Sequence, residues 1–139
     1  MPAVVDASLL VRLASGGEHH ALIGERLAAA IRDGVDLHAP ALMPYELESA
    51  VRGLVFANQI SEAAAMAGLA AVEELPISIH AHPGGGRILQ LAGRQGTRAA
   101  YDAAYLALAD ALGADLWTVD SRLAHHAERL GITALRIGP

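Results

Sequence analysis

The sequence predicts an α/β fold in which a short parallel sheet is flanked by helices. Short apolar segments alternate with longer segments whose apolar residues recur every three or four positions, from one end of the chain to the other. Such alternation is typical of a parallel sheet with both faces covered. With 139 residues, 53% of them apolar, the chain is long enough to bury a core, so we expect a single domain over residues 1–139.

Strands are predicted where a short apolar run ends at a polar residue or a turn. The segment 75–81 contains Pro76, which cannot donate a backbone hydrogen bond, so we expect it at an edge of the sheet. The predicted strands are residues 3–5, 35–39, 75–81, 114–119 and 134–137.

Helices are predicted where apolar residues recur at helical spacing between capping residues. Ser8 is expected to cap the first helix, Ser61 begins the fourth, and Gly131 follows the last. The predicted helices are residues 8–14, 18–33, 45–57, 61–74, 88–93, 98–113 and 121–130.

The segment 98–113 is the most regular of these helices. Its residues Tyr101, Tyr105, Leu108 and Leu112 recur at helical spacing, which predicts that they face the core. Asp102 lies among them near the start of the helix, and a carboxylate there must be solvated, paired or bound to a cation.

Composition narrows the possible functions. The net charge of −5 argues against a general nucleic-acid coat, and the absence of cysteine excludes disulfides and thiolate chemistry. All ten basic residues are arginine, which excludes lysine-dependent chemistry. The longest uncharged apolar run, residues 63–72, is far shorter than the roughly 20 residues of a bilayer span. Asp6 interrupts the only apolar start that a signal peptide would need, so we expect a cytoplasmic protein outside the membrane.

Four acidic residues are expected at one edge of the sheet. Asp6 and Asp120 end two predicted strands, Glu46 lies in the first turn of a helix after a strand, and Asp102 starts the central helix. Ligands of parallel sheets bind outside the carboxyl ends of the strands, and right-handed crossovers point those ends the same way. Clustered carboxylates repel one another unless a cation neutralises them, and an all-oxygen set suits Mg²⁺ or Mn²⁺.

A metal ion at such a site can activate water and clamp the oxygens of a phosphodiester. Ser8 and Thr118, each two residues from one of the acids, are expected to hold ligands or waters by hydrogen bonds. The alternative for any single acid is a turn former or a helix cap, so the prediction rests on the set.

The segments VVDASLLV, PYELESAV and AYDAAYLALADALGADLWTVD, in this order and spacing, resemble a PIN-domain protein, in particular a VapC-type toxin of a toxin–antitoxin pair. The resemblance covers nearly the whole chain and implies a PIN-like three-layer α/β/α fold. It implies a Mg²⁺-dependent endoribonuclease whose metal ligands are Asp6, Glu46, Asp102 and Asp120, with Ser8 at the hydroxyl position after the first acid. It also implies a type II toxin that is inhibited by a VapB-like antitoxin and commonly forms a homodimer.

Arginines near the acids are candidates for binding RNA phosphates, although solvated side chains or ion pairs are the alternative for each. The candidates are Arg12, Arg94, Arg98 and Arg122. A tyrosine at the rim, such as Tyr101, is able to stack a base. His80 and His82 would share a face of an extended segment, which leaves a metal role open for them.

Two other functions remain alternatives. One is a catalytically silent PIN-like domain that works through protein contacts. The other is a haloacid-type phosphatase, but that pattern needs a second aspartate two residues after the first, where this chain has Ser8.

Overall fold

The computed structural model describes residues 1–96 and 100–137 and has the predicted α/β architecture. Its parallel strands lie in the order β3-β2-β1-β4-β5. The strands are β1 (Pro2–Val5), β2 (Asp36–Pro40), β3 (Ile77–His80), β4 (Asp115–Thr118) and β5 (Ala134–Arg136). The segment around Pro76 therefore contributes an edge strand, as predicted.

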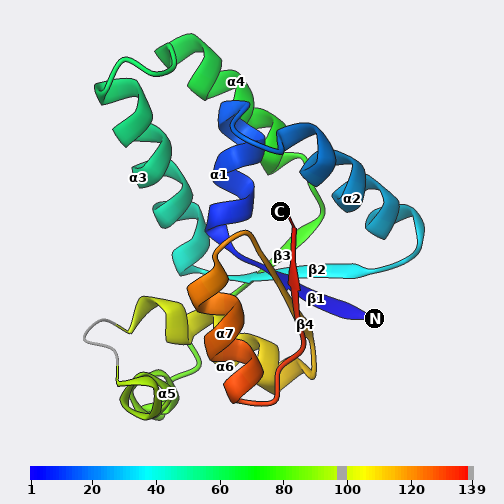
Figure 1. Ribbon diagram of the computed structural model, residues 1–139, viewed down its shortest axis with the longest axis vertical. Helices are drawn as coiled ribbons and strands as arrows, with labels where there is room; N and C mark the ends of the chain where they lie inside the picture. The colour runs from blue at the N-terminus through cyan, green and yellow to red at the C-terminus, as the bar shows by residue number, and fades with distance from the viewer. Residues whose placement is uncertain (97–99, 138–139) are drawn as a thin grey trace.

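Helices form a layer on each side of the sheet, so the fold is a three-layer α/β/α sandwich (Figure 1). One layer, above the sheet in the figure, holds α1 (Ala7–Ser15), α2 (His20–Arg32), α3 (Leu42–Phe56) and α4 (Glu62–Glu73). The layer below holds α5 (Arg87–Gln95), α6 (Tyr101–Leu112) and α7 (Ser121–Arg129). None of the described helices is both long and apolar enough to cross a membrane.

The central strand β1 has no solvent-exposed face. Val4 and Val5 are fully buried, and Val4 pairs with His38 of β2 on one side and Leu116 of β4 on the other. Burial of this kind fixes the strand, because each fully buried valine or leucine contributes about 1.5–3 kcal/mol to stability. The residue that follows, Asp6, is thereby held at a rigid point of the fold.

The start of α3 and the cap of α1 differ from the prediction. Helix α3 begins at Leu42 rather than at residue 45, because Pro44 lies in the first turn, where its missing N–H is not needed. Ser8 does not cap α1: the N-cap residue is Asp6, and Ser8 lies inside the helix with its hydroxyl turned toward that aspartate. The helix predicted to begin at Ser61 is α4, whose N-cap residue is Ser61, with its side chain accepting a hydrogen bond from the Ala64 N–H.

The buried face of α6 is also rotated from the one predicted. Tyr101 is 63% exposed and Leu108 and Leu112 are only partly buried, whereas Tyr105 is 1% exposed as expected. The sheet-facing side is formed largely by small residues, because α6 contacts β1, β2 and β4 closely as well as α5. The buried residues of α6 are Ala103, Tyr105, Leu106, Ala107 and Ala109.

Helices α1 and α4 approach each other closely at Gly68. A Cβ atom on Gly68 would lie 1.8 Å from the carbonyl oxygen of Ala14 and 2.7 Å from its carbonyl carbon. These are backbone atoms, so the clash cannot be relieved by a side-chain rotation. Gly68 is therefore required for the contact that positions α1.

We expect Gly68→Ala to lower the free energy of unfolding by about 1–3 kcal/mol, as for other overpacked sites. The matched control is Gly53→Ala on α3, where an added Cβ meets nothing within 4 Å. That control should be neutral or stabilising by about 0.5–1 kcal/mol, because alanine favours helix over glycine. Urea unfolding followed by circular dichroism measures both, and equal stabilities of the two variants would contradict the packing argument.

Candidate active site at the carboxyl edge of the sheet

The structure brings the four predicted acids to the carboxyl edge of the sheet. Asp6 directly follows β1, and Asp120 follows the end of β4 as the N-cap residue of α7. Glu46 lies in the second turn of α3, and Asp102 lies in the first turn of α6. Each of the four acts electrostatically on at least one other, so four separate elements contribute to one acidic cluster.

Asp6 is the most buried member, at 6% exposure. Its Oδ2 accepts hydrogen bonds from the Ser8 hydroxyl at 2.5 Å and from the Thr118 hydroxyl at 2.8 Å. Thr118 in turn accepts a bond from the Asp120 N–H at 2.9 Å. The two hydroxyls thus orient Asp6 and tie it to the turn between β4 and α7.

Glu46 is held by a tyrosine from the opposite helix layer. The Tyr105 hydroxyl donates to Glu46 Oε1 at 2.5 Å. Sequence reasoning assigned Tyr105 only to the core and missed this contact. The available signal was that a buried tyrosine hydroxyl needs a partner, and that Tyr105 lies three residues after Asp102, on the same side of the helix.

Asp120 has a structural role with one of its oxygens. Its Oδ1 accepts hydrogen bonds from the backbone N–H groups of Arg122 at 2.9 Å and Leu123 at 3.3 Å, which caps α7. The helix-cap alternative is therefore correct for this oxygen. Within the described chain, no hydrogen bond occupies its second oxygen, which leaves that atom for another ligand.

The surroundings of the cluster favour uncharged carboxyl groups. Burial raises the pKa of Asp6, and the nearby Asp102 and Asp120 add to it against the lowering effect of the Ser8 and Thr118 hydrogen bonds. Burial likewise raises the pKa of Glu46, with Asp6 and Asp102 adding to it. The pKa of Asp102 is raised by burial and by Asp120, against the opposing effect of Arg122 and His126. Such a cluster gains stability when a cation binds.

The chemistry of the site fits a hard divalent cation, because its donors are carboxylate and hydroxyl oxygens. As placed, however, no three acidic or histidine side chains of the described residues converge closely enough to hold an ion. Oxygens of Asp6, Glu46 and Asp120 are instead turned toward hydrogen-bond donors of the protein. The cluster thus has the charge and the oxygen donors that a divalent cation needs. To coordinate one together, the acidic side chains would have to rotate toward a common point.

Comparison with known sequences identifies the fold family. The PIN domain profile matches residues 3–129. The chain belongs to the PIN-domain family. It is 35% identical over 123 residues to Ribonuclease VapC1 of Mycobacterium tuberculosis, and the alignment covers 87% of each chain. The predicted resemblance to VapC-type PIN proteins is therefore confirmed.

Solved structures agree with this assignment. PAE2754 from Pyrobaculum aerophilum matches with a TM-score of 0.74 and 25% identity, over 96% of this chain and 83% of that one. VapBC-1 from nontypeable Haemophilus influenzae matches with a TM-score of 0.61 and 17% identity, over 98% of each chain, which supports the PIN fold alone.

The candidate RNA-binding arginines lie at different places on the PIN domain. Arg122, in the first turn of α7, is close enough to Asp102 to lower the pKa of its carboxyl group. Arg12 lies in the last turn of α1, where its nearest carboxylate oxygen belongs to Glu18 at 4.0 Å. Arg98 lies outside the described residues.

The histidines of the edge strand pair within the sheet. His80 Nε2 lies 2.8 Å from Nδ1 of His38 on the neighbouring strand β2. His82 Nδ1 accepts a hydrogen bond from the Gly84 N–H. His80 therefore pairs with His38 rather than with His82, a contact that the spacing in the sequence did not indicate.

Replacing Asp102 with asparagine should raise the Tm of the protein in a chelator at pH 7 by a few degrees. A carboxyl whose pKa is raised on folding stabilises the protein below its ordinary pKa, and this contribution is lost as the pH rises through the raised value. The gain from Asp102→Asn should therefore shrink as the pH falls toward 4. Scanning calorimetry across this pH range measures the effect, and a pH-independent gain would contradict the electrostatic cause.

If Glu46 is a metal ligand, Tyr105→Phe should weaken Mn²⁺ binding about 10–100-fold, as for other residues that orient such a ligand, because Glu46 loses its positioning hydrogen bond. The dependence of Tm on Mn²⁺ concentration measures this affinity. Tyr45→Phe, at an exposed position beside Glu46, is the control and should leave it unchanged. Equal Mn²⁺ affinities in wild type and Tyr105→Phe would show that the Tyr105–Glu46 bond does not support the site.

Proposed function

We propose that this PIN-domain protein is a Mg²⁺- or Mn²⁺-dependent endoribonuclease that acts as the toxin of a type II toxin–antitoxin pair. The observation that carries the proposal is the cluster of Asp6, Glu46, Asp102 and Asp120 at the carboxyl edge of the sheet. The relative that is 35% identical is named as a ribonuclease, which supports the same chemistry.

The four acids would hold the cation. Bound there, Mg²⁺ or Mn²⁺ would neutralise the cluster and supply Lewis-acid chemistry, lowering the pKa of a water and polarising the phosphodiester. Ser8 and Thr118 keep the Asp6 carboxylate in place, and Tyr105 keeps Glu46 in place. These side chains would act on the ligands rather than on the RNA.

The rim of the cluster has groups suited to single-stranded RNA. Arg122 lies beside Asp102 and is available for a phosphate. Tyr45 on α3 and Tyr101 on α6 are 76% and 63% exposed, and each directly precedes one of the acids in sequence. Exposed aromatic rings stack on unpaired bases, so these tyrosines would bind the nucleotides next to the cleaved bond by stacking.

The proposal includes protein partners. The 35% identical relative is named VapC1, and the resemblance to VapC-type toxins implies a VapB-like antitoxin as the inhibitor of this chain. Large apolar side chains remain for such a partner or for a second copy in a homodimer: Phe56 is 78% exposed and Met66 is 63% exposed. The protein would act in the cytoplasm, where its RNA substrates lie.

A catalytically silent PIN domain that only binds proteins is the second candidate. The observation that favours it is that, among the described residues, the acids do not already converge as a set of metal ligands. A silent domain would show no change in Tm with Mg²⁺, whereas an acidic cluster that binds metal is stabilised by it.

Asp6→Asn and Glu46→Gln should each reduce RNA cleavage in Mg²⁺ by at least about 100-fold, because loss of a ligand exceeds the usual 10–100-fold effect of its supporting residues. Glu48→Gln, an exposed change on the same helix as Glu46, should leave cleavage unchanged. Gel analysis of end-labelled RNA, with and without EDTA, measures the rates. Undiminished cleavage in the Asp6 variant would overturn the proposed mechanism.

A further inference from the structure

A small pocket between the ends of α5 and α7 is not used by the proposed mechanism. It has a volume of about 130 Å³ and is lined by Arg94, Gln95, His126, Arg129 and Leu130. Ligand sites for whole drug-sized molecules measure roughly 300–1,000 Å³, so this pocket suits a smaller group. Its lining is mostly polar and cationic, which points to an anion.

Three polar atoms of the pocket residues are buried without a partner. Gln95 Nε2 and Oε1 and His126 Nδ1 have no hydrogen bond within residues 1–96 and 100–137. A buried polar atom left in this way lowers the stability of the fold, so a fold keeps few of them without a ligand. Because Gln95 offers both a donor and an acceptor, its ligand should supply an acceptor and a hydroxyl side by side.

The two arginines of the pocket are available to a ligand. Neither Arg94 nor Arg129 forms a salt bridge with a described residue, whereas Arg87, also on α5, is paired with Asp110 at 2.7 Å. Both arginines lie in the last turn of a helix, and the helix dipole alone favours a cation there. The dipole does not account for the buried amide of Gln95, which an anion between the arginines does.

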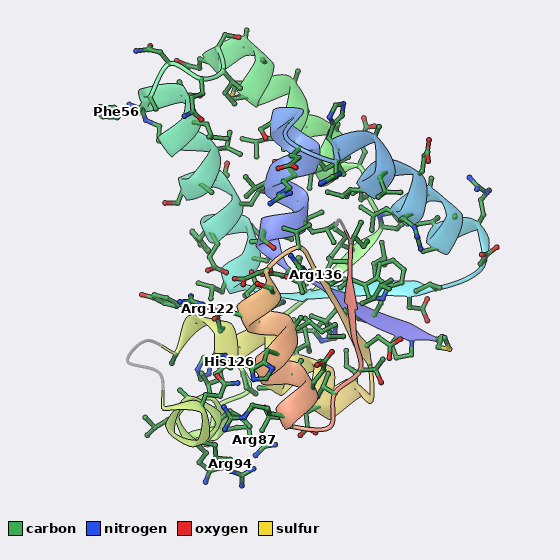
Figure 2. All side chains as sticks on the ribbon, viewed as in Figure 1. Phe56, Arg87, Arg94, Arg122, His126 and Arg136 are labelled. Atoms are coloured by element: carbon green, nitrogen blue, oxygen red, sulfur yellow. The ribbon has the colours of Figure 1, made fainter. Side chains whose placement is uncertain are left out.

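The pocket is connected to the acidic cluster through α7. Arg122 and His126 lie one turn apart on this helix, and both are close enough to act on the Asp102 carboxylate. His126 also lines the pocket with Arg94. Figure 2 shows this succession, with His126 between Arg122 near the start of α7 and Arg94 on α5. A strand cut at the acids would pass along this face.

We propose that this pocket binds a backbone phosphate of an RNA strand, away from the one that is cut, together with the adjoining ribose 2′-hydroxyl. Arg94, Arg129 and the amide N–H of Gln95 donate to the phosphate oxygens, and the 2′-hydroxyl donates to the Gln95 carbonyl. RNA supplies this acceptor and hydroxyl pair, whereas DNA and free phosphodiesters lack the hydroxyl. The inference rests on the proposed ribonuclease function, of which it specifies the substrate contact.

The first test compares two double variants of the full chain with the same loss of charge. Arg94→Ala with Arg129→Ala removes the pocket cations, and Arg26→Ala with Arg32→Ala removes two exposed arginines of α2. The probe is a fluorescent 20-nucleotide single-stranded RNA, titrated in EDTA so that cleavage cannot interfere. We expect the pocket variant to bind on the order of tenfold more weakly, with a salt-dependence slope smaller by about 0.7, and the α2 variant to match wild type.

The second test uses Gln95→Met, which keeps the side-chain length and removes both amide atoms. RNA affinity should fall several-fold while affinity for DNA of the same sequence changes less, because DNA has no 2′-hydroxyl for Gln95 to accept from. The Tm should stay the same or rise, since an unsatisfied buried amide is lost. Equal losses for RNA and DNA would overturn the 2′-hydroxyl contact.

Inorganic phosphate provides the third comparison. If phosphate raises the Tm of wild type but not of the Arg94/Arg129 variant, while RNA binding is equal in both, the pocket is a free-anion site and the RNA assignment is overturned. If both double variants lose RNA affinity equally, the effect is one of net charge and the proposal also fails. Selective loss of RNA binding by the pocket variant supports it even if the wild type cuts no RNA, which would then count against the proposed function alone.

Discussion

The buried carboxylate of Asp6 is the constraint on which the rest of the site depends. It lies at the end of the central strand, at 6% exposure, with other acids close by. A buried charge is costly unless it is hydrogen-bonded, and the Ser8 and Thr118 hydroxyls meet part of that cost. Arg122 and His126 offset part of the repulsion at Asp102, and the proposed cation would offset the rest.

The order of the strands and helices brings the other three acids to Asp6. Strands β1 and β4 are neighbours in the sheet. Asp6 follows β1 and Asp120 follows β4, so the two acids lie near each other. Helices α3 and α6 bring Glu46 and Asp102 from opposite faces of the sheet, and the Tyr105–Glu46 hydrogen bond joins those two layers. The acids are thus fixed by the whole fold rather than by one loop.

Elements with strong periodicity could be predicted from the sequence, and contacts between distant segments could not. The edge position of β3 followed from Pro76, and the strand-end acids followed from the rule for parallel sheets. The start of α3 was misplaced because a proline is as compatible with the first turn as with the preceding loop. The face of α6 was misjudged because the helical spacing of the large residues placed Tyr101 in the core, whereas the sheet-facing side is formed largely by alanine. The Tyr105–Glu46 hydrogen bond and the burial of the Gln95 amide join segments that are far apart in the sequence, so local patterns did not predict them.

The hydrogen bonds within the acidic cluster bear on which ion it would accept. Burial, with the Glu46 hydrogen bond, raises the pKa of Tyr105 far above its ordinary value, so its hydroxyl stays protonated and donates to one Glu46 oxygen. One oxygen of Asp6 and one of Asp120 are occupied in the same way. An oxygen that already accepts a hydrogen bond is a weaker metal ligand, so in the proposed site each of these acids would coordinate mainly through its other oxygen. Ca²⁺ commonly takes bidentate carboxylates in a large shell, whereas Mg²⁺ takes single oxygens and keeps its waters. In the proposed metal site, the protein's own hydroxyls and amides would therefore favour the smaller ion.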